Sequence, residues 1–365
     1  MTERQAHIAF NLTEKVGSAT LAKLVSEHGS AVKAWEAWPK KVARSGGDVD
    51  WVAEEKTASR FGVKIVTKVD DGYPAMLAES PGAPLVLYVK GSVEALSRPG
   101  VAMVGTRRAT TYGRNAASRI SYDLAKAGWS IISGLALGID AESHRGALDA
   151  GGLTVGVIGS GLDRFYPEEN RELAREIVKK GGAVVSEFPF GRSADTTTFP
   201  IRNHVVAALA TGVVAVEAPL KSGTLITTSI AADLGRTVMA VPARVTDRMS
   251  SGCLSLIHDG AVPVRGAADV VEALGVQPGT VAPADEGEPA SARDEDTPPY
   301  SVEEALVMTH VDEDGVTIDD LVRLTHLPVE KVSSVAMELR IKGFVRFLPG
   351  NRISLCRVVF KTGLA

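Results

Sequence analysis

The sequence predicts an α/β fold: a Rossmann-like, mostly parallel sheet with helices on both faces, plus a small helical N-terminal domain and a C-terminal winged helix. Three observations predict it. Short β-rich runs alternate with segments of helical length between residues 100 and 275, residues 1–65 have apolar side chains at helical spacing, and residues 300–365 have the pattern of three helices and a hairpin. Strands that alternate with helices form βαβ units, which build a parallel sheet.

The alternation is clearest in the β-rich runs, which are 101–104, 130–132, 155–158, 183–186, 213–216 and 238–241. Segments of helical length and pattern lie between them, among them 114–127, 168–179 and 227–234. In such folds the ligand binds beyond the carboxyl ends of the strands. The residues that follow each strand are therefore the candidates for function.

The two terminal regions have their own patterns. In 1–65 the apolar spacing is broken at Gly17 and Gly29, an arrangement that fits either a DNA-binding helix-hairpin-helix or a small packing bundle. Residues 300–365 contain a capping box that begins at Ser301 and a second capping pattern that begins at Thr317. A helix with Val332, Ala336 and Leu339 on one face follows, and then a hairpin formed by 344–348 and 352–355.

Composition restricts the class of protein. Of the 365 residues 45% are hydrophobic, enough for a substantial core, and the longest apolar stretch, 205–216, is too short to span a membrane. Two cysteines without a CxxC pair predict neither a zinc site nor a disulfide framework, so we expect a cytoplasmic protein without a metal. The net charge of −4 arises from the Pro-rich segment 279–299, which has one basic and six acidic residues; the rest of the chain is at +1. We predict domains at 1–65, 66–278 and 300–365, with 279–299 as a linker.

Small and polar residues follow several predicted strands. Glycines there let backbone N–H groups approach a ligand, and hydroxyl, Lys and Arg side chains add donors, which is the equipment of a phosphate site. The residues concerned are Gly105, Thr106, Arg107, Ser133, Gly134, Gly159, Gly161, Lys221, Ser222, Gly223 and Thr224. The dinucleotide fingerprint fails because Arg164 occupies its third glycine position, and a P-loop fails because Lys221 lacks the preceding glycine frame. Convergence of these loops on one sheet edge predicts a shared site.

Catalytic machinery is not evident. Asp140 and His144 are one helical turn apart, but the pattern of a helix cap and a buried, hydrogen-bonded histidine is favoured over an acid–base pair. Glu187 and Glu217 each follow a strand without a partner that the sequence identifies. No catalytic residue and no cofactor is predicted.

These motifs together resemble the DNA-processing protein DprA (Smf) family in order and spacing. The resemblance rests on Gly105-Thr106-Arg107, the run 133–140, Gly161 through Tyr166-Pro167-x-x-Asn170, Ser186-Glu187-Phe188-Pro189, Phe199-Pro200-x-Arg202-Asn203, the run 221–227, and Gly235-Arg236 leading to Val241-Pro242. It covers the Rossmann-like body densely, and the two terminal domains extend it over nearly the whole chain.

The resemblance implies a dimeric, non-enzymatic protein that binds single-stranded DNA, protects incoming strands and loads the RecA recombinase in natural transformation. It implicates the loops at Gly105–Arg107 and Lys221–Thr224 in the DNA pocket, with Phe199, Arg202 and Asn203 nearby. Phe199, Phe165 and Tyr166 are the candidates for stacking on a base.

Three residues depart from the family pattern. His204 replaces an Arg, which predicts weaker or more pH-dependent DNA binding. Ala243 replaces a Gly and Leu254 an Asn, which we interpret as changes in loop geometry.

Two other hypotheses stay open. One is a Rossmann-like nucleotide-binding enzyme or sensor in which Glu217 or Asp140 assists cleavage of a glycosidic bond; the other is a duplex-DNA regulator that uses the winged helix. The cations available to the winged helix are Lys331, Arg340, Lys342, Arg346 and Arg352, but 300–365 has a net charge of −1, which favours a partner or dimer contact over DNA.

Overall fold

The computed structural model describes the chain except residues 14–15, 39–41, 45–47, 276–300, 313–314, 343, 349–351 and 356–365 and the side chains of Val302 and Ile341. The chain divides into two compact units, Met1–Thr280 and Val281–Ala365. The predicted linker 279–299, the turn of the predicted hairpin and Cys356 lie outside the described residues. The predicted domain boundaries stay predictions.

The first unit begins with a group of helices. They are α1 (Glu3–Leu12), α2 (Ser18–His28), α3 (Ala31–Ala37) and α4 (Trp51–Phe61). Gly17 is the N-cap of α2, and Gly29 ends it with a φ of 86°, a left-handed conformation that favours glycine. The predicted breaks at both glycines are therefore confirmed.

A single sheet forms the body of this unit, in the order β1-β2-β6-β5-β4-β3-β7-β8-β9 among the described residues. Every pair from β6 to β9 is parallel, while β1 and β2 are added antiparallel. The predicted Rossmann-like, mostly parallel sheet is thus confirmed. The strands are β1 (Lys64–Thr67), β2 (Val86–Gly91), β3 (Gly100–Val104), β4 (Ser130–Ser133), β5 (Thr154–Val157), β6 (Ala183–Ser186), β7 (Gly212–Ala215), β8 (Thr237–Ala240) and β9 (Val262–Pro263).

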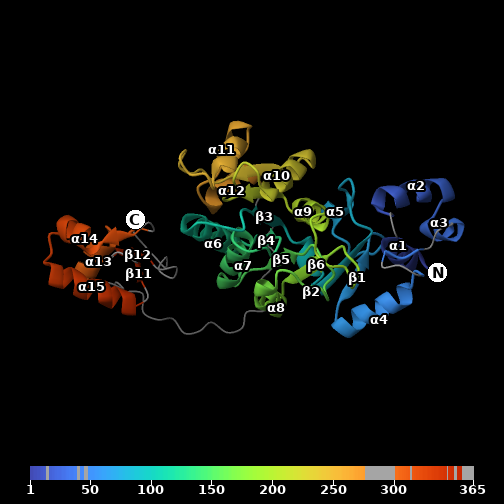
Figure 1. Cartoon of the computed structure of the whole chain (residues 1–365), viewed down its shortest axis with the longest axis horizontal. Helices are drawn as coiled ribbons and strands as arrows, with labels where there is room; N and C mark the ends of the chain where they lie inside the picture. The colour runs from blue at the N-terminus through green and yellow to red at the C-terminus, as the bar shows by residue number, and fades with distance from the viewer. Residues whose placement is uncertain are drawn as a thin grey trace. The chain divides into compact units, whose positions relative to one another are not determined.

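Helices cover both faces of the sheet (Figure 1). On one face of the sheet, alternate strand residues form a core with α6, α7 and α12, and α8 packs beside these helices. On the opposite face, the other strand residues form a core with α5, α9, α10 and α11. Along β3, Val101 and Met103 enter the first core and Ala102 and Val104 the second, which explains the continuous apolar run. The helices are α5 (Ala75–Ala78), α6 (Thr111–Lys126), α7 (Ile139–Asp149), α8 (Arg171–Lys179), α9 (Thr198–Leu209), α10 (Gly223–Asp233), α11 (Ser251–His258) and α12 (Ala267–Leu274), with short 3₁₀ turns at Glu94–Ser97 and Glu168–Asn170.

The N-terminal helices share a core with the antiparallel edge of the sheet. Phe10 packs edge-on against Trp35 with ring centroids 5.2 Å apart, and both belong to one apolar cluster with Ile65 and Tyr88 of β1 and β2. Polar groups line the same junction: the Glu54 carboxylate accepts from the Phe190 N–H at 3.0 Å. The helical region is therefore built onto the sheet through β1 and β2.

Glu187 lies at this junction, and we expect it to make the free energy of unfolding depend on pH. Burial raises its pKa from 4.5 to about 7, opposed by the charge of Arg44. Folding therefore takes up a proton between pH 4.5 and 7, and the contribution of Glu187 to stability is lost as the pH rises through this window. We expect Glu187→Gln to be more stable than the parent by about 3 kcal/mol at pH 8 and equally stable at pH 4. Urea unfolding at both pH values tests this; the same difference at both would contradict it.

The second unit is the predicted winged helix. It contains α13 (Val302–Met308), α14 (Ile318–Thr325) and α15 (Val329–Ile341), with a small sheet of β10 (Val316–Thr317), β12 (Arg352–Leu355) and β11 (Val345–Leu348) in that spatial order. The capping box at Ser301 and the cap at Thr317 both form. Val332, Ala336 and Leu339 are buried in its core, as their spacing predicts.

Candidate nucleic-acid interface

The strand order places between β3 and β7 the switch point at which open α/β sheets have a crevice. From β3 the chain adds β4, β5 and β6 on one side, whereas β7 and β8 lie on the other. The loops that follow β3 and β7 therefore diverge, and ligands of open α/β sheets bind at such a switch point. The Thr106 N–H donates to the Glu217 carbonyl at 2.7 Å and holds the two loops together at their base.

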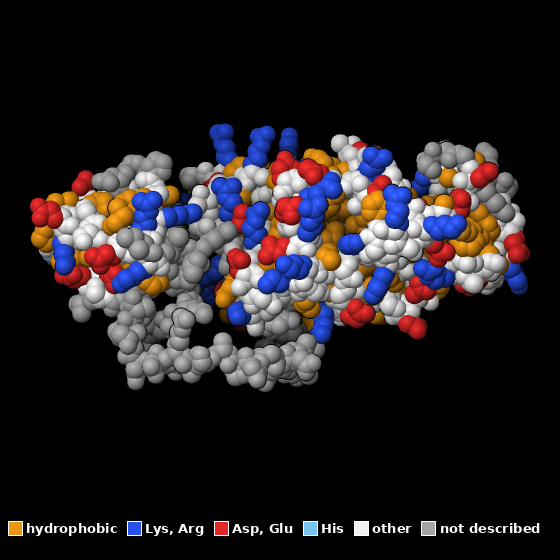
Figure 2. Space-filling model, turned by 90° about the horizontal axis from the view of Figure 1, so that it is seen from below, with side chains coloured by type: hydrophobic (Ala, Val, Ile, Leu, Met, Phe, Trp, Pro, Cys, Tyr) orange, Lys and Arg blue, Asp and Glu red, His pale blue; other side chains and the backbone are white. Residues whose placement is uncertain are grey.

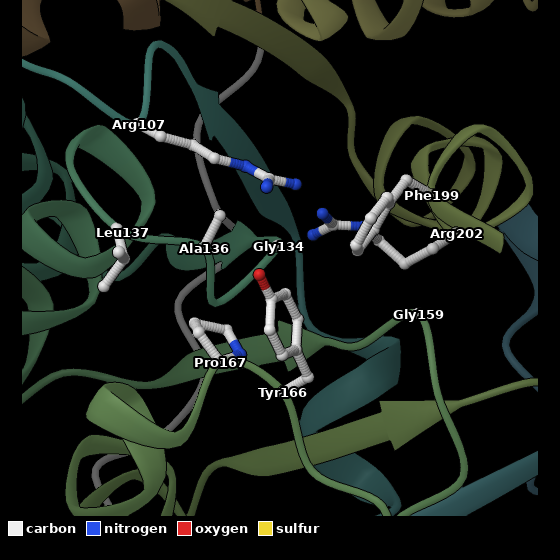
Figure 3. Close-up of a pocket in the computed structure, with 9 residues that line it drawn as sticks. All are labelled: Arg107, Gly134, Ala136, Leu137, Gly159, Tyr166, Pro167, Phe199 and Arg202. Carbon is white, nitrogen blue, oxygen red and sulfur yellow. The ribbon is translucent and has the colours of Figure 1, made fainter. Parts of the chain in front are cut away.

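A small pocket opens beside this switch point at the carboxyl ends of the strands (Figure 3). Its cavity volume is about 30 Å³, far below the roughly 300–1,000 Å³ of a small-molecule site. A pocket this shallow suits a group on a larger ligand better than an enclosed nucleotide. It is lined by Arg107, Gly134, Ala136, Leu137, Gly159, Tyr166, Pro167, Phe199 and Arg202.

An arginine and two aromatic rings surround the mouth of the pocket. The exposed Arg107 points across the pocket toward Phe199, and its guanidinium carbon is 4.8 Å from the centre of that ring (Figure 3). The Tyr166 ring lies 6.2 Å from the Phe199 ring, and its hydroxyl points into the pocket. A guanidinium over an aromatic face keeps its charge and its N–H groups available to an anion.

A second guanidinium lies beneath, on α9. Arg202 is only 6% exposed; its Nη1 donates to the Val157 carbonyl at 3.2 Å and lies 3.9 Å from Oδ2 of Asp140. Asp140 in turn accepts from the N–H groups of Gly134 at 3.1 Å and Ala136 at 3.3 Å. The Arg202 Nε finds no hydrogen-bond partner among the described residues. The pocket therefore has a buried positive charge in its floor.

Burial governs the electrostatics of this pair. Burial raises the pKa of Asp140, and the positive charge of Arg202 opposes this rise. Burial lowers the pKa of Arg202; the charge of Asp140 opposes this decrease and the charge of Arg107 adds to it. A guanidinium nevertheless stays protonated in proteins, so the pair keeps Arg202 charged in a water-poor site. A second anion above Arg202 would also offset the repulsion between the two arginines.

Five of the predicted residues line the pocket: Arg107, Gly134, Gly159, Phe199 and Arg202. Four others support the loops from beneath. Thr106 Oγ1 accepts from the Arg108 N–H, Ser133 Oγ donates to the Met103 carbonyl, Gly161 N–H donates to the Arg192 carbonyl, and a Cβ at Gly105 would lie 2.4 Å from the Ile139 side chain.

The predicted loop at Lys221 lies outside the pocket, at the start of α10. Lys221 and Gly223 are exposed, Thr224 is buried, and the Ser222 side chain makes no capping bond to the helix. Because β7 is the neighbour of β3, this loop lies on the other side of the switch point. Asn203 is half-buried on α9 and does not line the pocket.

The sequence argument named Tyr166 as a stacking candidate but did not assign three other pocket residues to the site: Ala136, Leu137 and Pro167. Tyr166 was signalled by the Tyr-Pro motif and Ala136 and Leu137 by the run 133–140. The role of Asp140 as the counter-ion of Arg202 had no local signal, because the two residues are far apart in the sequence.

Three of the residues considered for catalysis, Asp140, Glu217 and His144, are engaged in structural bonds, whereas the buried Glu187 Oε1 has no hydrogen-bond partner among the described residues. Glu217 is fully buried, and its Oε2 accepts from the Thr110 N–H at 2.8 Å. His144 contacts Thr154 Oγ1 through Nδ1 at 2.6 Å and makes no bond to Asp140; burial lowers its pKa to about 3. The favoured interpretation of this pair is confirmed for the buried, hydrogen-bonded His144. It is wrong for Asp140, because Gly138 is the N-cap of α7 and Asp140 accepts from the preceding loop instead.

His204 faces away from the pocket, with its Nε2 2.8 Å from the Pro81 carbonyl oxygen. The cations of the winged helix also have partners within their own unit. Lys331 pairs with Glu303, Lys342 with Glu304, Arg340 lies over Phe347, Arg346 donates to Ser354 Oγ, and Arg352 donates to the Gly315 carbonyl.

Within the described residues, no helix has the length and hydropathy needed to cross a membrane. In the same part of the chain, no cluster of three or more His, Cys, Asp or Glu side chains has the arrangement of a metal site.

Family models match three parts of the chain. Residues 64–275 match "DNA recombination-mediator protein A", 288–351 match the DprA winged helix domain, and 2–60 match the DprA-like N-terminal HHH domain. The first match alone covers more than half of the chain.

Relatives and solved structures agree. Protein Smf of Synechocystis is 31% identical over 96% of this chain and 98% of its own length, and the DNA processing protein DprA of Streptococcus pneumoniae is 40% identical over 56% and 71%. The structure of the S. pneumoniae protein has a TM-score of 0.61 at 30% identity and covers 74% of this chain and 98% of its own. DNA processing protein A of Helicobacter pylori, whose structure is described in terms of its single-stranded DNA binding mode, has a TM-score of 0.52 at 29% identity, over 58% and 95%. The chain belongs to the DprA (Smf) family of DNA recombination mediators.

Proposed function

We propose that the protein binds single-stranded DNA across the carboxyl ends of β3, β4, β5 and β7. The observation that carries the proposal is the exposed Arg107 guanidinium over the Phe199 ring, at the mouth of a pocket whose floor is the buried Arg202. Charge together with an aromatic face holds a strand without reading its sequence, because every phosphate is charged and every base has a π-face. The single-stranded DNA binding of the H. pylori protein supports the same class of ligand.

In this proposal each group has a defined task. Arg107 and Lys221 bind successive phosphates on the two sides of the switch point, while Phe199 and Tyr166 stack on a base. Arg202 supplies positive potential from beneath, and the N–H groups at the start of α10 bind a phosphate oxygen. Figure 2 shows Lys and Arg side chains spread over a face of the molecule with acidic ones among them, so local geometry and not overall charge selects the site.

We further propose that the protein is a cytoplasmic homodimer that protects incoming strands and loads RecA in natural transformation. Family membership supports this role. Sedimentation analysis tests the dimer. RecA assembly on protected single strands, followed by its DNA-dependent ATP hydrolysis with and without the protein, tests the loading.

The Arg107→Ala variant tests the site. Loss of one phosphate contact is expected to lower the affinity for single-stranded DNA about tenfold and to reduce the salt slope of log K by about 0.7–1. Anisotropy titrations of single-stranded and duplex oligonucleotides across a salt series measure both.

The matched control is Arg98→Ala, which removes the same charge at a residue that precedes β3. Arg98 therefore lies at the amino ends of the parallel strands, away from the proposed site. Equal losses in both variants would mean that binding is diffuse and would remove Arg107 from the site. If the parent binds no single strand but gains thermal stability from nucleotides, the nucleotide-binding alternative replaces the proposal.

A further inference from the structure

The loop after β8, residues 241–250, lies on the same edge of the sheet as the proposed site. Val104 of β3 is aligned with Ala215 of β7, and Ala215 with Ala240 of β8. The three strands are parallel, so their carboxyl ends form a row. The loop after β8 is therefore next in line after the loops of Arg107 and Lys221.

Hydrogen bonds fix this loop against both neighbours. At its start the Tyr112 hydroxyl, from the first turn of α6, donates to the Pro242 carbonyl at 3.0 Å. At its end the Gly252 N–H donates to the Ala218 carbonyl in the loop after β7 at 2.7 Å. The β8 loop is thus held in place relative to the other two loops.

The three loops together concentrate positive charge in a chain whose net charge is −4. Residues 105–110, 216–222 and 241–250 contain the cations Arg107, Arg108, Lys221, Arg244 and Arg248, all of them exposed. Their two acids already accept hydrogen bonds: Glu217 is fully buried against the Thr110 N–H, and Asp247 Oδ1 accepts from the Met249 N–H at 2.9 Å. The loops that follow β3, β7 and β8 thus each have at least one exposed cation at the carboxyl ends of the strands.

We propose that the β8 loop is a second contact site for the same DNA strand, in which Arg244 and Arg248 bind phosphates. The inference rests on the proposed function and extends it. The strand then runs perpendicular to the β-strands, from the pocket over β5 and β4, past Arg107 and Lys221, to Arg248. Four strand spacings of about 4.8 Å make this path about 19 Å long. At about 3.4 Å per stacked nucleotide, the path holds about six nucleotides.

The length of the bound strand separates the two sites. Oligothymidylates of about four, eight and sixteen nucleotides are titrated into the full chain and into the double variant Arg244→Gln/Arg248→Gln across a salt series. The shortest strand fits on the pocket and the Arg107 loop alone, so the variant keeps the parent's affinity for it. For the two longer strands the variant loses about fivefold or more in affinity, and its salt slope falls by about 0.7 for each lost contact.

The control is the double variant Arg98→Gln/Lys126→Gln, which removes two charges at the other edge of the sheet, before β3 and in the last turn of α6. It is expected to bind all three lengths as the parent does. If the β8-loop variant matches this control with the longest strand, the second contact site is wrong. If the parent binds no strand of any length, it is the proposed function that fails.

Discussion

Replacing Arg202 by Met is expected to lower the free energy of unfolding by about 3–5 kcal/mol, because it leaves the carboxylate of Asp140 buried without its counter-ion. Both side chains are less than a tenth exposed, and Arg202 Nη1 also donates to the Val157 carbonyl. Removing one partner of a buried ion pair destabilises a protein by more than the intact pair stabilises it. The remaining charge is buried without hydration and without a counter-ion.

A second substitution tests this reason. In Arg202→Met/Asp140→Asn the amide oxygen still accepts from the Gly134 N–H but has no charge, so we expect the double variant to recover more than half of the loss. Urea denaturation of the parent, both single variants and the double variant measures the coupling. A double variant as unstable as Arg202→Met would show that lost packing, and not the unpaired carboxylate, causes the effect.

The second large effect is expected from Gly134→Ala. An alanine Cβ there would lie 1.4 Å from Arg202 Nη1 and 2.7 Å from Asp140 Oδ2, so the guanidinium must leave its place. Its nearest open space is the pocket itself. We therefore expect a loss of about 2–4 kcal/mol in stability from the separated pair and a loss of single-strand binding of at least about tenfold, because Arg202 then fills the pocket.

Gly223→Ala is the matched control, because this glycine also follows a strand and was predicted to approach phosphate. Nothing lies within 4 Å of a Cβ at position 223, the first residue of α10. We expect its stability to change by less than about 1 kcal/mol, with a gain from the helix propensity of alanine. Equal destabilisation in both variants would contradict the assignment of Gly134 as the space for Arg202.

Much of the architecture could be predicted from the sequence because its causes are local. The β-rich runs became β3 to β8, all parallel, and the capping patterns at Ser301 and Thr317 start helices where they stand. Parallel strands alternating with helices then bring the strand-end loops to one edge. The antiparallel strands β1 and β2, and the core that they share with the N-terminal helices, were not predicted. The pairing of β2 with β6 and this shared core join segments that are distant in sequence.

The sequence could not predict which residues of the site are exposed in the pocket and which are bonded within the protein. Thr106, Ser133 and Gly161 have the residue types of a phosphate site, yet their polar groups are hydrogen-bonded to the backbone of the protein. Arg107 follows a predicted strand and Arg202 was implicated by the family resemblance. In the structure Arg107 is exposed over an aromatic ring, whereas Arg202 is buried beside a carboxylate.

The sequence by itself determined the fold class and the edge of the sheet at which ligand-binding loops collect, because hydrophobic periodicity and turn residues act over a few positions. Tertiary structure alone decided which of those loop residues line the pocket. The pocket is formed by α9 and by the loops of three strands, which meet only when the sheet is assembled, and the burial of Arg202 beside Asp140 depends on that assembly.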